Sequence, residues 1–177
     1  MQGGFAGFNL VTGPFKVGVA PAPAAATTAP ASRPAATALS LRLERDARIT
    51  RAGEAIPVTL VFTNTSDQPI WVNTNLADAP VQFDVRGGRV ENRPLAPAAA
   101  TPLNAADFVR LEPKASHTVP LRDLDSARQK HRLALGGTYL VRVTYRNEHD
   151  GAAFGVAAWT GSVTSEALVI EAAGPAQ

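Results

Sequence analysis

The stretch from residue 135 to residue 145 constrains the fold of this chain more than any other part of the sequence. From Tyr139 to Tyr145 every second residue is a tyrosine or a valine, and this period of two is typical of a half-buried β-strand. Gly136 and Gly137 come directly before it, and glycine permits a chain reversal beside a bulky ring. The combination predicts a tyrosine corner, in which the Tyr139 ring packs inward and its hydroxyl donates a hydrogen bond back to the turn.

Similar short segments follow one another from residue 38 onward, separated by turn residues. Besides the strand at 139–145, we expect strands at 39–44, 56–63, 70–72, 81–85, 108–111, 117–121, 156–163 and 167–170. About seven to nine short strands with turns at near-regular spacing predict an all-β fold. We interpret it as an immunoglobulin-like antiparallel β-sandwich that carries an extended N-terminal arm.

Three details of this sandwich are also predicted. Gly87 and Gly88 indicate a tight hairpin that returns toward Val90. Trp71 is expected to fill the space between the two sheets. Residues 123–133 are expected to form one or two helical turns before the tyrosine corner.

The first 37 residues differ in composition from the rest of the chain. Residues 1–19 hold three of the seven phenylalanines among many glycines, whereas residues 20–37 are nearly all Ala, Pro and Thr. The second segment reads as an extended spacer that reaches about 55 Å at ~3.1 Å per residue. We therefore expect an arm (1–37), a β-sandwich (38–172) and a C-terminal tail (173–177). The arm residues expected to bind a partner protein are Phe5, Phe8, Leu10, Val11, Phe15 and Val17.

The sequence offers few candidate residues for catalysis or ligand binding. The chain has no cysteine, which removes disulfides and thiolate sites, and its three histidines, at 117, 131 and 149, have no close metal-ligand spacing. The polar loop 148–151, the pair Asp123 and Asp125, and the group Asn73, Asn75 and Asp78 offer cation ligands, but turn and cap bonding explains them equally well. No Gly-x-Ser-x-Gly or phosphate-binding glycine motif occurs. We expect no enzyme activity, no cofactor and no metal.

Several segments in this order resemble bacterial immunoglobulin-like domains of secreted or envelope proteins. The resemblance rests on residues 53–60, 64–66, 111–116, 135–139 and 159–165, and it covers residues 38–172. It implies the sandwich fold and a periplasmic or cell-envelope location, and it implies no catalytic residues. The first five residues lack the basic and apolar regions of a signal peptide, so the alternatives of export and retention inside the cell both stay open.

Two functions fit these observations. The leading hypothesis is a non-catalytic accessory subunit that docks on a larger protein complex through its arm and the surface of its sandwich, and that meets a membrane only through its partners. The alternative is an envelope ligand-binding or adhesion module that uses the loops 73–80, 93–107 and 146–155. Lys and Arg (17) nearly balance Asp and Glu (15) and form no dense patch with aromatics, so nucleic acid is not expected as a partner. Self-association through the arm is a variant of the leading hypothesis.

Overall fold

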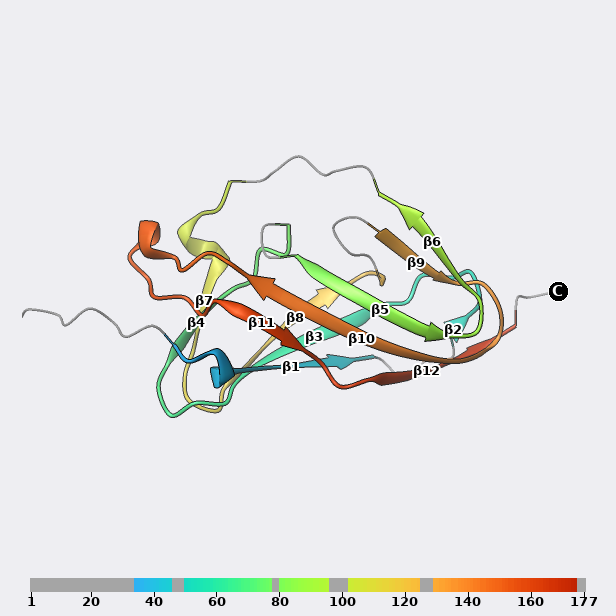
Figure 1. The fold of residues 1–177 in the computed structure, drawn as a ribbon, viewed down its shortest axis with the longest axis horizontal. Helices are drawn as coiled ribbons and strands as arrows, with labels where there is room; N and C mark the ends of the chain where they lie inside the picture. The colour runs from blue at the N-terminus through green and yellow to red at the C-terminus, as the bar shows by residue number, and fades with distance from the viewer. Residues whose placement is uncertain (1–33, 46–49, 78–79, 96–101, 125–128, 175–177) are drawn as a thin grey trace, which may run out of the picture. The chain divides into compact units, whose positions relative to one another are not determined.

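The computed structural model of this chain describes residues 34–45, 50–77, 80–95, 102–124 and 129–174, all of which belong to the unit formed by residues 31–177. These residues form an all-β fold with short 3-10 helical turns (Figure 1). The strands are β1 (Leu39–Glu44), β2 (Thr50–Arg51), β3 (Val58–Asn64), β4 (Ile70–Asn73), β5 (Val81–Gly87), β6 (Val90–Pro94), β7 (Phe108–Leu111), β8 (Ser116–Leu121), β9 (Gln129–Leu133), β10 (Gly137–Asn147), β11 (Gly161–Thr164) and β12 (Leu168–Ala173). The helical turns are η1 (Ala36–Ala38), η2 (Ala105–Asp107) and η3 (Ala152–Phe154). The arm residues predicted to bind a partner lie outside the described residues.

The long strand β10 organises the larger sheet, as its sequence period predicted. It pairs with β5 along one edge and with β12 and then β11 along the other, and β2 adds to β12 in parallel (Figure 1). Strands β11 and β12 are separated at Ser165, whose hydroxyl accepts a hydrogen bond from the backbone N–H of Val143 at 3.1 Å. The described residues contain twelve strands where about seven to nine were expected, and the three that were not expected are β2, β6 and β9.

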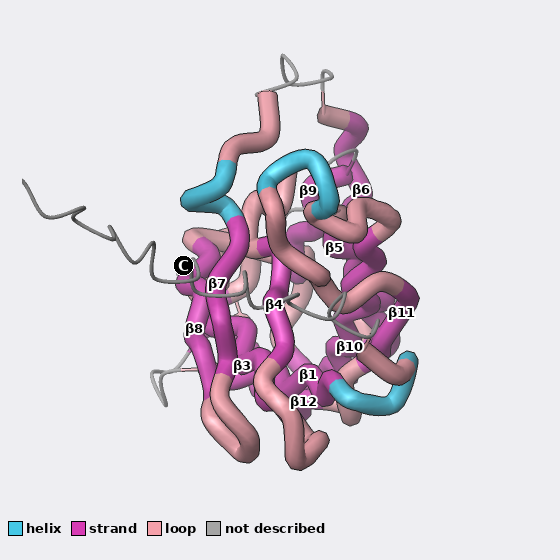
Figure 2. Tube along the Cα trace, turned by 90° about the vertical axis from the view of Figure 1, so that its left-hand side faces the viewer, coloured by secondary structure: helices cyan, strands magenta, loops and turns pink. Residues whose placement is uncertain are grey.

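A second sheet, in the order β1-β3-β8, is antiparallel throughout. Its inward residues and those of the larger sheet enter one hydrophobic core, and their rings touch: the centroids of Phe62 and Tyr145 are 5.0 Å apart. Tyr145 also stacks on Trp159, with the two centroids 6.0 Å apart. Two-stranded ribbons, β4 with β7 and β6 with β9, complete the fold, and Figure 2 looks onto the end where β4 and β7 lie side by side.

The tyrosine corner is confirmed. The Tyr139 side chain is fully buried, and its hydroxyl donates to the backbone carbonyl of Leu135 at 2.8 Å, with the carbonyl oxygen of Arg89 at 3.2 Å. The hairpin expected at the neighbouring glycines is wrong, because β6 pairs with β9 and not with β5. Gly88 instead leaves room for the Tyr139 ring, because a Cβ at this position would lie 2.4 Å from the Tyr139 hydroxyl oxygen.

Three further expectations are corrected. Residues 129–133, expected within a helical segment, form strand β9, and 125–128 lie outside the described residues. Trp71 is only half-buried, whereas Trp159 is fully buried and is the tryptophan that enters the core. Strand β12 ends at Ala173, one residue inside the expected C-terminal tail.

Candidate interaction surfaces

The three histidines considered as metal ligands lie on different elements of the fold. His117 lies on β8, His131 on β9 and His149 after β10. Among the residues that the structure describes, no group of three or more His, Cys, Asp or Glu side chains is placed to hold a metal ion. The turn bonding considered for 73–78 occurs at its start, where the side chain of Asn73 accepts a hydrogen bond from the backbone N–H of Asn75 at 3.0 Å. Asp78 and Asp125 lie outside the described residues.

Asp123 has a structural role that sequence reasoning missed. Its carboxylate is buried, and one oxygen accepts hydrogen bonds from the backbone N–H groups of Ile56 and Leu124, both at 3.0 Å. The other oxygen pairs with Arg132 on β9, and the Lys130 ammonium lies 3.6 Å from it. This carboxylate therefore ties the residues before β3 to the β9 strand.

The described parts of the three loops of the ligand-binding alternative meet at one end of the fold, while residues 78–79 and 96–101 of these loops lie outside the described residues. The backbone N–H of Thr74 donates to the carbonyl of Asp107 at 2.8 Å, which joins the first loop to the second. The side chain of Asn73 lies 3.4 Å from that of Asn147, and the Tyr145 hydroxyl donates to the Asn73 carbonyl at 2.7 Å, which joins the first loop to the end of β10. We call residues 73–77, 102–108 and 146–160 the end-loop cluster.

Side-chain hydrogen bonds and one ring contact connect the segments of the end-loop cluster. The Asn147 amide donates to the carbonyls of His149 and Trp159, at 2.9 and 2.5 Å. In the second loop, Asn104 and Asp107 cap η2 reciprocally, and the ring of Phe108 then lies 5.5 Å from that of Phe154 in η3. The hydrogen bonds order each loop from within, and the contact between the two rings joins one loop to another. The cluster is therefore held in a defined conformation.

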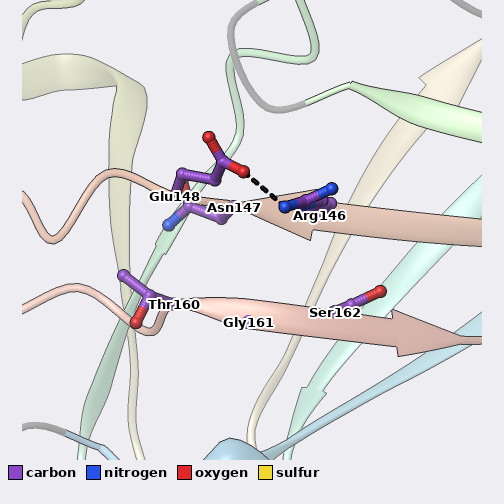
Figure 3. A pocket seen from close by; sticks show the side chains of 6 residues that line it. All are labelled: Arg146, Asn147, Glu148, Thr160, Gly161 and Ser162. Carbon is purple, nitrogen blue, oxygen red and sulfur yellow. Dashed lines mark ion pairs between the residues drawn. The ribbon is translucent and has the colours of Figure 1, made fainter.

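An open pocket of about 490 Å³ lies beside this cluster, where β10 ends and β11 begins (Figure 3). It is lined by Arg146, Asn147, Glu148, Thr160, Gly161 and Ser162. The Arg146 guanidinium pairs with the Glu148 carboxylate at 2.7 Å, and both side chains are mostly exposed. Ser162 is the register partner of Arg146 on β11, so hydroxyl, guanidinium and carboxylate groups face one shallow space. The pocket is suited to hydrogen-bonding ligands.

The outer face of the larger sheet forms a second candidate surface. Leu140 on β10 is 46% exposed and its register partner Val169 on β12 is 55% exposed. Only two other large apolar side chains in the described part of the chain, Leu95 and Leu135, are exposed to a similar degree. Charged residues surround the apolar pair: Arg86 is the register partner of Leu140 on β5, and Asp84 and Arg142 face each other one step along. We call Asp84, Arg86, Leu140, Arg142, Val169 and Glu171 the sheet-face patch.

The outer face of the smaller sheet is different. Hydroxyl groups cover it, and the Thr63 and Ser116 side chains are hydrogen-bonded to each other at 2.7 Å. Val61 and Pro120 are the apolar residues of the described strands on this face; Val61 is buried, and its register partner Arg42 pairs with Glu44. The exposed apolar pair of the larger sheet is therefore a local feature and not a general property of the fold.

No family model and no curated protein matches this sequence. Within the described ranges, no helix has the length and apolar character needed to cross a membrane. The geometry of the two surfaces is thus the basis for a functional assignment.

Proposed function

We propose that this chain is a non-catalytic accessory subunit that docks in a larger protein assembly of the periplasm or cell envelope. Docking uses two regions, the N-terminal arm and the sheet-face patch. One observation carries the proposal: Leu140 and Val169 are neighbours on a regular sheet and are about half exposed. Adjacent apolar side chains within a polar rim are typical of protein interaction surfaces.

The composition of the arm supports the same role. Burying a phenylalanine side chain contributes roughly 1.5–3 kcal/mol, so Phe5, Phe8 and Phe15 together offset part of the cost of ordering the segment. The Ala- and Pro-rich residues 20–37 lose less conformational entropy on binding than a glycine-rich linker does. The arm is therefore suited to anchor the domain at a distance from its partner.

We further propose that residues 38–172 form an immunoglobulin-like sandwich. Three observations support this. Strand β1 pairs in one sheet while the following β2 pairs in parallel with β12 in the other, a corner made by a strand that switches sheets. The tyrosine corner opens β10, and buried Trp159 lies in the shared core.

The arm and the patch are tested by cross-linking in cells with affinity-tagged full-length chain, followed by reconstitution with the purified captured protein. We expect a variant with Phe5→Ser, Phe8→Ser and Phe15→Ser to lose at least about tenfold in affinity for that protein, because its aromatic anchors are gone. Leu140→Glu is expected to weaken the complex as well. Leu135→Glu is the matched control, since this equally exposed leucine lies outside the patch, and it should bind like the unmodified chain. Unchanged affinity in both the triple variant and the Leu140 variant would refute the proposal.

A second candidate function is favoured by the end-loop cluster. Three loops distant in sequence are held together by the buried side chains of Asn73 and Asn147 and by a hydrogen bond from Asn75 to the half-buried Asp107, beside an open pocket. A preorganised, concave group of loops at the end of a β-fold is a common design for binding sites. On this alternative the chain is an envelope ligand-binding or adhesion module, and the pocket takes a polar ligand such as a glycan or an extended peptide.

The ligand-binding alternative is tested by screening the full chain on glycan and peptide arrays. We expect Arg146→Ala to reduce binding of any ligand found by about tenfold, because its guanidinium lines the pocket. Arg42→Ala is a matched control: Arg42 is also exposed and also pairs with a glutamate two residues along its strand, at 2.5 Å, but on the other sheet. Equal losses in the two variants, or no ligand on either array, would count against this function.

A further inference from the structure

We propose that strand β11 binds an extended peptide segment of a partner protein, which adds to the larger sheet as a further strand beside β11. The inference deepens the ligand-binding alternative, on which it rests, by naming the ligand class as peptide and the contact as backbone pairing. Strand addition needs an edge strand whose outward N–H and C=O groups are unpaired and open to solvent. Among the described strands β11 pairs only with β10, so its other side is such an edge.

The hydrogen bonds to β10 determine which backbone groups of β11 face outward. The N–H of Ser165 donates to the carbonyl of Val143 at 2.9 Å, so these two residues form a bonded pair. Bonded and non-bonded pairs alternate along an antiparallel ladder, and the register then places Ser162 and Thr164 in non-bonded pairs. The backbone N–H and C=O groups of Ser162 and Thr164 therefore point away from β10.

These outward groups are accessible. Ser162 and Thr164 are both exposed residues. Within the described part of the chain, no backbone hydrogen bond outside the ladder with β10 uses either of them. An added strand can therefore form two backbone hydrogen bonds with each residue, one as donor and one as acceptor.

The other strand edges are less suited to this role. The same alternation identifies outward residues on β1 and along most of β5 that are at most 6% exposed, so other parts of the chain cover their backbone; these residues are Leu39, Leu41, Leu43, Val81 and Phe83. On β8 the outward residues include Pro120, which has no N–H to donate. Strand β12 has β2 beside it. The edge of β11 combines exposure with a full set of donors.

The pocket beside β11 adds side-chain recognition. Arg146 lies directly across the ladder from Ser162, on the neighbouring strand (Figure 3). A long arginine side chain can pass over a small serine and reach the residue that an added strand places on the far side. The ion pair of Arg146 with Glu148 is 67% and 69% exposed, and such exposed pairs contribute little, so the guanidinium can exchange Glu148 for a peptide carboxylate. We therefore expect an acidic peptide residue opposite Ser162.

The proposal is tested by nuclear magnetic resonance titration of the isotope-labelled full chain. The probes are twenty heptapeptides, Thr-Val-Thr-X-Thr-Val-Thr, in which X is each amino acid in turn. We expect the peptides with X as Asp or Glu to bind best, with a dissociation constant of about 10–500 µM, because the backbone contact is short. The peptide with Lys should bind at least about tenfold more weakly, and the one with Pro should not bind. If no peptide of the set binds below about 1 mM, the proposal is overturned.

Amide hydrogen exchange separates strand addition from binding through side chains alone. In the complex, the amides of Ser162 and Thr164 should exchange at least about tenfold more slowly, because they become hydrogen-bonded. The amide of Val163 already faces β10, so its exchange should change much less. A peptide that binds without protecting either outward amide would contradict strand addition.

A pair of variants tests the backbone donor itself. Thr164→Pro removes an outward N–H and is expected to raise the dissociation constant of the best peptide at least about tenfold. Thr164→Val is the matched control, since it keeps the N–H, and it should stay within about twofold of the unmodified chain. Equal affinities of the two variants would refute the proposed contact. Circular dichroism checks both folds, and the exchange measurement on the unmodified chain decides if the proline variant does not fold.

The outcomes also separate this inference from the function on which it rests. A glycan that binds the unmodified chain but not Arg146→Ala, with no peptide bound, would overturn strand addition and leave the ligand-binding alternative in place. Absence of any peptide or glycan ligand would remove both. The accessory role depends on the arm and the sheet-face patch, so neither result bears on it.

Discussion

Trp159→Ala is expected to lower the free energy of unfolding of this chain by about 3–5 kcal/mol. The Trp159 side chain has no exposed surface and stacks on Tyr145, which in turn meets Phe62 of the other sheet. Removing the indole therefore leaves a cavity at the point where the two sheets share their aromatic core. The surrounding rings belong to regular strands and cannot collapse into that space without shifting their backbone.

The matched control is the other tryptophan. Trp71→Ala is expected to cost only about 1 kcal/mol, because this side chain is half-buried and its backbone carbonyl still accepts the hydrogen bond from the Trp159 N–H. Urea unfolding followed by far-ultraviolet circular dichroism measures both variants without relying on tryptophan fluorescence. Equal losses, or a larger loss at Trp71, would mean that the wrong tryptophan has been placed in the core.

The contrast between these two tryptophans shows that local sequence patterns do not predict which side chain enters the core. Ile70 and Val72 face the core, so the period of a strand places Trp71 on the other side, but the expected strand of three residues was too short to fix that direction. Trp159 comes before β11 in a segment without a period. Its burial depends on β4 and β10, which are distant in sequence, and no local signal indicates it.

Features set within a few residues were predicted well. The alternation in β1 and β10 requires only neighbouring side chains, and the tyrosine corner spans five residues, from Leu135 to Tyr139. Strand β9 was missed for a local reason as well. Its buried alternate positions are His131 and Leu133, and a buried histidine hides the apolar period on which strand prediction relies.

The candidate surfaces needed long-range information. Leu140 was placed on the opposite side of its strand from Tyr139 by the sequence period, but its pairing with Val169 on β12 follows from sheet register. The three loops of the ligand-binding alternative were singled out by composition and length. Their contact depends on Asn73 and Asp107, whose partners lie in other loops, so the end-loop cluster is visible only in the folded chain.

Asp123→Ala is expected to lower the free energy of unfolding by about 3–5 kcal/mol, although it removes only one small side chain. The substitution leaves the N–H groups of Ile56 and Leu124 without their acceptor and leaves the Arg132 guanidinium, 19% exposed, without its carboxylate. Each of these groups has lost most of its access to water, so the cost is the desolvation of groups that are no longer paired. Chemical denaturation of the variant and the unmodified chain gives the difference directly.

Asp84→Ala is the matched control for this effect. Asp84 also pairs with an arginine, at 2.9 Å, but its side chain is 49% exposed and solvent replaces the lost partner. The expected loss there is below about 0.5 kcal/mol, as for most exposed ion pairs. Similar losses at Asp84 and Asp123 would show that burial does not decide the outcome.

A third variant separates the two parts of the Asp123 effect. Combining Asp123→Ala with Arg132→Leu removes the uncompensated cation, so this chain should be more stable than the single Asp123 variant. Recovery should be incomplete, because the backbone N–H groups of Ile56 and Leu124 still lack an acceptor. Full recovery would mean that charge alone carries the effect. If stability recovers only in part, the remaining loss of unfolding free energy comes from the two amides, and so from the role of Asp123 in joining the start of β3 to β9.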